Sequence, residues 1–160
     1  MKIFNLLSKT AFLSFLLVAF VFVSCKDDDD ETPGTVDNNE IVGKWQLTAV
    51  EPENSSTTIP QLSLLPTLAP CYKELKFTFT NDNKVTLSDC DAAVALIGAF
   101  VNIAADTKWN VETGKLTLTN GSTSNTFGLT QNPNDMKIVV NTNTTGTGTP
   151  VNAVMSLKRL

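Results

Sequence analysis

The stretch IVGKWQLTAV, residues 41 to 50, opens the part of the chain in which apolar and polar residues alternate. Lys44, Gln46 and Thr48 would share one face of an extended strand. The opposite face would carry the odd positions, which are Ile41, Gly43, Trp45, Leu47 and Ala49. Successive side chains of a strand point to opposite faces, so this pattern predicts a strand with one buried and one solvent-facing side.

The same alternation recurs downstream in KELKFTFT (73–80), KVTLSD (84–89), TKWNVETGKLTLT (107–119), NTFGLT (125–130), MKIVVN (136–141) and VNAVMSLKR (151–159). In the third of these, Thr113 and Gly114 predict a two-residue turn with Val111 opposite Leu116, which makes eight strands in all. Strands joined in sequence without a long crossover favour an up-and-down closed barrel over a two-sheet sandwich, because closure removes the sheet edges. We therefore expect one all-β, antiparallel, eight-stranded barrel over residues 41–160.

Two apolar insertions do not fit this pattern. IPQLSLLPTLAP, residues 59–70, is predicted to be a loop interrupted by proline, and DAAVALIGAFVNIAAD, residues 91–106, a short helical insertion with Asp91 as its N-cap. They would either plug one barrel mouth or form the lip of a ligand cavity. In the second case the ligand-binding residues would be Leu62, Leu64, Leu65, Leu96, Phe100, Ile103 and Trp109.

The N-terminus has the layout of a signal peptide. Lys2 and Lys9 precede an apolar run, 11–23, that is broken only by Ser14 and is short for a membrane-spanning helix. The residues before Cys25, ending in Ser24, resemble the lipobox of bacterial lipoproteins. That resemblance implies that residues 1–24 are removed and that acyl chains on Cys25 hold the protein on a membrane.

An acidic run follows the cysteine directly. It consists of Lys26, Asp27, Asp28, Asp29 and Asp30, followed by Glu31. It resembles the surface-export signal of lipoproteins from Bacteroidetes-type bacteria, which implies a location on the outer face of the outer membrane. The alternative is a solvated linker of like charges. Either way, residues 25–40 are expected to form a flexible, lipidated tether.

Charge divides the chain into the same two parts. Residues 26–40 contain one Lys and seven acids, a net charge of −6, whereas residues 41–160 contain eight Lys, one Arg and nine acids, a net charge of zero. A domain without net charge has no overall attraction for nucleic acid. We therefore expect no nucleic-acid partner, and a membrane contact only through the N-terminal lipid.

The segment VGKW resembles the G-x-W signature of lipocalins, whose Trp packs across one end of the barrel. Lipocalins cover that Trp with an Arg after the last strand, and Arg159 has the inward parity for this role beside Gly43 and Trp45. The two later cysteines and the W-x-V-x-x-G-K-L-T-L segment make residues 41–160 similar to lipocalin-like lipoproteins of Bacteroidetes. The alternative is that Trp45 is an ordinary core residue.

With Cys25 taken by lipid, Cys71 and Cys90 remain as a candidate disulfide in an oxidising compartment. A register that keeps Phe77 and Val85 inward would send these cysteines to opposite faces. The second strand must therefore stop near Tyr72, or a bulge must intervene.

The chain contains no His, which excludes Ser-His-Asp and Cys-His catalysis and every His-containing metal site. No Gly-rich phosphate loop follows a predicted strand. We therefore expect no catalytic residue, metal or cofactor. Two functions remain: a module that binds a small, largely apolar ligand, or a surface interaction protein with a filled barrel whose apolar insertions contact a partner protein.

Overall fold

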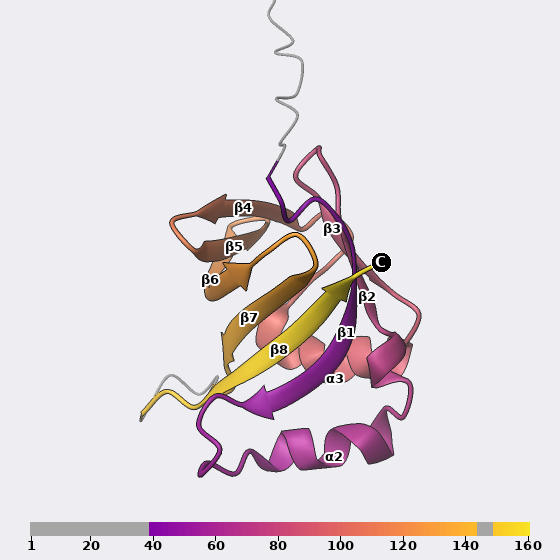
Figure 1. The fold of residues 1–160 in the computed structure, drawn as a ribbon, viewed down its shortest axis with the longest axis vertical. Coiled ribbons are helices and arrows are strands. Elements are labelled where there is room, and N and C mark those ends of the chain that lie inside the picture. Colours follow the sequence, from indigo (N-terminus) through magenta and orange to yellow (C-terminus); the bar gives the residue numbers. More distant parts are fainter. Residues whose placement is uncertain (1–38, 144–148) are drawn as a thin grey trace, which may run out of the picture. The chain divides into compact units, whose positions relative to one another are not determined.

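Eight antiparallel strands follow one another around a nearly closed barrel (Figure 1) in the order β3-β2-β1-β8-β7-β6-β5-β4. The structure is a computed structural model that describes residues 39–143 and 149–160. The predicted signal peptide, Cys25 and the tether up to residue 38 lie outside the described residues. The strands are β1 Gly43–Pro52, β2 Lys76–Phe79, β3 Val85–Ser88, β4 Lys108–Glu112, β5 Lys115–Asn120, β6 Thr123–Gln131, β7 Asp135–Asn141 and β8 Asn152–Arg159.

Two contacts complete the barrel, one between the first and last strands and one between the two edge strands of the sheet, β3 and β4. The first strand pairs with the last along most of its length, from Trp45 opposite Arg159 to Pro52 opposite Ala153. Between β3 and β4 there is only an isolated bridge, supported by a hydrogen bond of 3.1 Å from the Val85 amide to the Thr107 carbonyl. The expectation of an antiparallel eight-stranded barrel is thus confirmed, with one incompletely paired seam.

The hairpin between β4 and β5 has the predicted register, with Val111 opposite Leu116. Its turn residues Thr113 and Gly114 have φ values of 48° and 71°. Positive φ at both central positions belongs to the turn whose twist matches that of the flanking strands.

A bulge in β1 corrects the predicted face of Ala49. Leu47 pairs with Leu157, but the next aligned pair is Ala49 with Ser156, so the register shifts by one residue. Beyond this point Val50 lies opposite the inward-facing Met155. Val50, and not Ala49, therefore continues the inner face that begins at Trp45.

The first apolar insertion is a helix, α2 (Pro60–Leu68), and not the predicted loop. Proline is well suited to the first helical position because its fixed φ matches the helix and its missing N–H has no partner there anyway. Pro66 lies inside the helix and removes one backbone hydrogen bond. Burial of Leu65 and of Ala69, just past the end, holds the helix on the barrel.

The second insertion forms α3 (Asp91–Val101), which lies in the connection between β3 and β4. Its N-cap is Cys90, so Asp91 is the first helical residue and not the cap that the sequence predicted. Its carboxylate still lies in the first turn, where the helix dipole favours an acid. The helix is terminated by its C-cap residue Asn102, which adopts the left-handed conformation with φ 44°.

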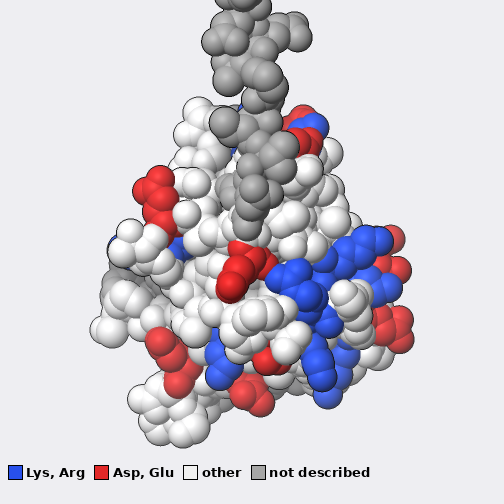
Figure 2. Space-filling model, turned by 45° about the horizontal axis from the view of Figure 1, so that its top comes forward, with Lys and Arg blue, Asp and Glu red and all other residues white. Residues whose placement is uncertain are grey.

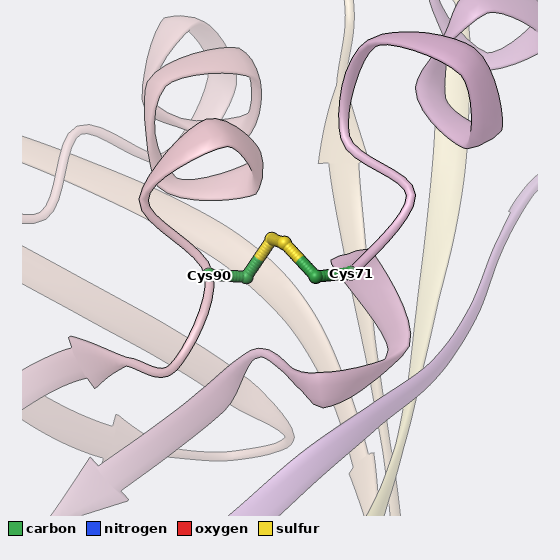
Figure 3. Close-up of a disulfide and its surroundings, with 2 residues drawn as sticks. All are labelled: Cys71 and Cys90. Atoms are coloured by element: carbon green, nitrogen blue, oxygen red, sulfur yellow. A yellow bond between two sulfur atoms is a disulfide. The ribbon is translucent and has the colours of Figure 1, made fainter.

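The predicted disulfide between Cys71 and Cys90 is present, with 5.7 Å between the Cα atoms (Figure 3). The parity objection disappears because Cys71 does not lie in a strand. A 3-10 turn, η1 (Tyr72–Glu74), follows it, and β2 begins only at Lys76. The bond therefore joins the segment after α2 to the start of α3.

Apolar side chains fill most of the barrel interior. The largest that are almost fully buried are Trp45, Trp109, Phe77, Phe79, Ile41, Leu47, Leu75, Leu116, Met136, Ile138, Met155 and Leu157. A cavity lies at the end of the barrel where α2 and α3 pack.

A candidate ligand cavity under the two helices

The end of the barrel at which β1 starts is closed by Trp45 and Arg159. The guanidinium carbon of Arg159 lies 4.1 Å from the centroid of the fully buried Trp45 ring. The Trp45 Nε1–H donates to the Ile41 carbonyl at 2.7 Å, and Arg159 donates to the carbonyls of Glu40, Val42 and Pro133. This cation–π contact and the hydrogen bonds seal the end against a ligand.

Gly43 is required by this arrangement. Its φ is +139°, and a Cβ atom at this position would lie 2.5 Å from Nη1 of Arg159. A side chain would therefore displace the guanidinium from the tryptophan ring. The G-x-W spacing thus has a physical cause here, since the glycine makes room for the arginine that covers the tryptophan.

The opposite end contains a cavity of about 190 Å³ that is partly open to solvent. The two helices form one wall, and the inner faces of β1, β7 and β8 form the other. The described residues that line it are apolar except for one amide: Val50, Gln61, Leu62, Leu65, Ala95, Leu96, Ile97, Ala99, Phe100, Val140, Ala153 and Met155.

Four of the seven residues predicted to bind a ligand line this cavity, namely Leu62, Leu65, Leu96 and Phe100. They come from two insertions that are far apart in the sequence, and contacts between α2 and α3 bring them together.

The other three do not line it, which corrects the prediction. Leu64 lies on the outer side of α2 and is 52% exposed. Ile103 follows the end of α3 and packs against the core elsewhere. Trp109 is buried at the seam between β3 and β4, where its ring meets Phe79 edge-on at 6.1 Å. Its Nε1–H donates to the Thr80 carbonyl at 3.1 Å, so it belongs to the barrel core.

Sequence reasoning missed all four strand residues in the lining. Val50 was hidden by the bulge, which reverses the parity that alternation predicts. Val140, Ala153 and Met155 have the inward parity, but parity alone does not tell which layer of the barrel the helices cover. Gln61 carried no signal, because a single amide in an apolar segment resembles an ordinary surface residue.

A second hollow, more open and of about 300 Å³, adjoins the entrance. We call it the polar cleft, and its lining residues are Thr58, Ile59, Pro60, Gln61, Thr142, Asn143 and Val151. Gln61 belongs to both the apolar cavity and this cleft. The hydroxyl of Thr142 donates to the Val151 carbonyl at 2.8 Å, which fixes one wall of the cleft.

Charged groups gather elsewhere on the barrel. Figure 2 shows Lys and Arg side chains together on one side of the face in view. The register gives such a group on the outer sheet surface, where Lys76 and Lys158 flank Gln46 on the neighbouring strands β2 and β8. A hydrogen bond from Ser88, together with Lys76 at 3.4 Å, lowers the pKa of the Asp89 carboxyl. Although the domain has zero net charge, it carries a local group of basic side chains. Neither Lys76 nor Lys158 lines the cavity.

Among the described residues, no three His, Cys, Asp or Glu side chains lie close enough together to hold a metal ion. In the same part of the chain, no helix combines the length and apolar character needed to cross a membrane.

The comparison with protein families identifies the fold. The family model of the lipocalin-like domain matches residues 41–145, which is more than half of the chain. The chain belongs to this lipocalin-like family, whose barrels are in general non-enzymatic binding folds. No curated protein and no solved structure matches the chain significantly.

Proposed function

We propose that this protein binds a small, largely apolar ligand in the cavity between α2, α3 and the inner faces of β1, β7 and β8. The observation that carries the proposal is the cavity itself, which lies in a lipocalin-like barrel and has eleven apolar lining residues and one amide. Apolar burial then provides most of the binding free energy, at about 0.8 kcal/mol for each methylene group removed from water.

The size of the cavity limits the ligand. A cavity of about 150 Å³ with apolar walls is enough to hold benzene. The cavity of about 190 Å³ therefore suits one aromatic ring or a short alkyl chain, and not a steroid or a complete long-chain lipid.

We further propose that the domain is held on the outer face of the outer membrane by acyl chains on Cys25. The support is the apolar run, the cysteine and the acidic export-like segment of the N-terminal sequence. The described chain enters the barrel at the end closed by Trp45, where Arg159 holds the Glu40 carbonyl. The cavity lies at the other end of the barrel.

A second candidate function is an interaction surface for a partner protein. Leu64 and Leu68 are 52% and 54% exposed on the outer side of α2, one helical turn apart. They offer apolar area without a charged residue in the helix. This surface does not include the cavity, so the two functions can be separated by mutation.

Phe100→Asp tests the ligand-binding proposal, because Phe100 lines the cavity and is only partly buried. The variant is expected to keep the β-type circular dichroism of the barrel and to lose uptake of a hydrophobic fluorescent probe. Leu64→Asp is the matched control, since it places the same charge on the outer side of α2 and should leave probe uptake unchanged.

Two results would count against the proposal. A large fall in melting temperature for Phe100→Asp would mean that the helices are a structural plug, because the new charge would then be buried without a partner. The second result combines two observations. If Leu64→Asp abolishes binding of a partner protein to the domain, and Phe100→Asp leaves probe binding unchanged, the interaction surface is favoured.

A further inference from the structure

The apolar cavity and the polar cleft adjoin each other and share Gln61 in their linings. Strand β7 passes from Val140 in the cavity to the segment at Thr142 in the cleft, and the chain at β8 passes from Ala153 in the cavity to Val151 in the cleft. The Gln61 side chain lies where the two meet. The part of a ligand that does not fit in the cavity would therefore extend into the cleft.

Among the described residues, no charged side chain lines either hollow. With the exception of Val50, the lining residues come from four described stretches of sequence, 54–70, 92–105, 138–143 and 149–157, and none of these contains Asp, Glu, Lys or Arg. The nearby Glu53 carboxylate accepts a hydrogen bond of 2.8 Å from the Nδ2 of Asn152 and lines neither hollow. A ligand with a charged head would thus find no opposite charge in the cleft, and an anion would approach Glu53.

The polar groups in the cleft are neutral. Gln61 and Thr58 are exposed and offer an amide and a hydroxyl, and the Thr142 oxygen can still accept a hydrogen bond while its proton is donated to Val151. Such groups suit hydroxyl or amide partners, which both donate and accept. A carboxylate can only accept, and an ammonium group can only donate.

We propose that the ligand is a neutral amphiphile, with a short alkyl chain or single ring in the cavity and an uncharged, hydroxyl-bearing head in the cleft. This proposal rests on the proposed function and adds the selection of the head. Alkyl glycosides and monoacylglycerols share this chemistry. A charged head at the same place would lose part of its hydration without gaining an ion pair, so charged analogues should bind more weakly.

The test uses the unacylated chain from residue 25 onward, with Cys25→Ala, so that no detergent competes with the probes. Affinities are measured by calorimetry for five probes with the same six-carbon chain: hexyl glucoside, hexanoyl glycerol, hexanol, hexanoate and hexylammonium. The two neutral amphiphiles are expected to bind at least about ten-fold more tightly than hexanoate, a difference that is easily measured. The comparison of glucoside with glycerol ester distinguishes a sugar head from a lipid head.

Gln61→Lys provides the second arm, with Ser63→Lys as its control. Both add a lysine to an exposed position of α2, but only residue 61 lines the cleft. Gln61→Lys should strengthen hexanoate binding relative to hexyl glucoside, and Ser63→Lys should leave the ratio unchanged.

The possible outcomes distinguish a failure of this inference from a failure of the proposed function on which it rests. Equal affinity for all five probes, or tightest binding of hexanoate or of hexylammonium by the unmodified cleft, would overturn the selection of a neutral head and leave the apolar site intact. No binding of any probe, including hexanol, would overturn the proposed function itself.

Discussion

Replacing Cys71 and Cys90 together by alanine is expected to lower the melting temperature of the domain substantially. The bond closes a loop with a sequence separation of 19 residues. In the chain-entropy model such a loop restricts the unfolded chain by about 11 cal/mol/K, which corresponds to about 3.2 kcal/mol of stability at 25 °C. An unfolding entropy of about 2.1 cal/mol/K per residue over residues 41–160 converts this to a decrease of about 13 °C.

The bond also has a local role. Cys90 is the N-cap residue of α3 and is 3% exposed, so the disulfide fixes the first turn of the helix that roofs the cavity. Without the bond, amide hydrogen exchange in α3 should accelerate more than exchange in β7 or β8. The reason is that α3 packs on the domain through one face only, whereas β7 and β8 are each paired on both sides.

Thermal melts followed by circular dichroism, with and without a thiol reductant, measure the effect. Reductant should lower the melting temperature of the wild-type protein to near that of the double alanine variant and leave the variant unchanged. A decrease of less than about 4 °C, roughly 1 kcal/mol for a domain of this size, would refute the reasoning that the bond acts by constraining the unfolded chain.

Three further predictions concern other parts of the chain. Gly43→Ala should lower the free energy of unfolding by about 1–3 kcal/mol, because the new Cβ meets Arg159 at 2.5 Å in a backbone conformation that favours glycine. Gly98→Ala is the control. It lies in α3 with nothing within 4 Å of the new atom, so it should instead raise the melting temperature slightly. Cys25→Ala should move the protein from the detergent phase to the aqueous phase, and an unchanged partition would contradict lipid anchoring. Changing the acids of residues 27–30 to Asn should leave the anchored protein inaccessible to external protease; continued cleavage would show that they serve only as a linker.

The strands were predictable because nearly all of them have one face in the core and one in water. Alternation therefore located all eight, and the Thr113-Gly114 pair also fixed the register of its hairpin. The bulge after Leu47 was not predictable, since its local sequence fits a regular strand equally well. Its consequence is that Val50 replaces Ala49 in the interior.

The helix α2 was missed because two prolines in nine residues argue against a helix on propensity alone. It forms because Pro60 occupies the first helical position and Leu65 packs against the barrel, and tertiary packing of this kind outweighs propensity in short helices. The position of Trp109 was wrong for a related reason. Where the barrel seam closes depends on contacts between β3 and β4, which the sequence of neither strand reveals.

The site was therefore predictable only in part. The cavity residues in α2 and α3 could be predicted from the two apolar insertions, because a helix with apolar residues on all sides must bury some of them. The strand half of the cavity, and Gln61 at its entrance, depend on how the insertions lie over the barrel. That arrangement is tertiary, and single-sequence patterns do not contain it.

The methionine methyl groups offer the most direct measurement of the central claim that the cavity binds a small apolar ligand. Met155 lines the cavity, whereas Met136 is buried in the barrel core and does not. In a protein labelled with ¹³C at the methionine methyl groups, titration with hexanol or toluene should shift the Met155 resonance saturably and leave that of Met136 almost unchanged. If neither resonance moves up to the solubility limit of the probe, or both move in proportion without saturation, the barrel has no specific apolar site.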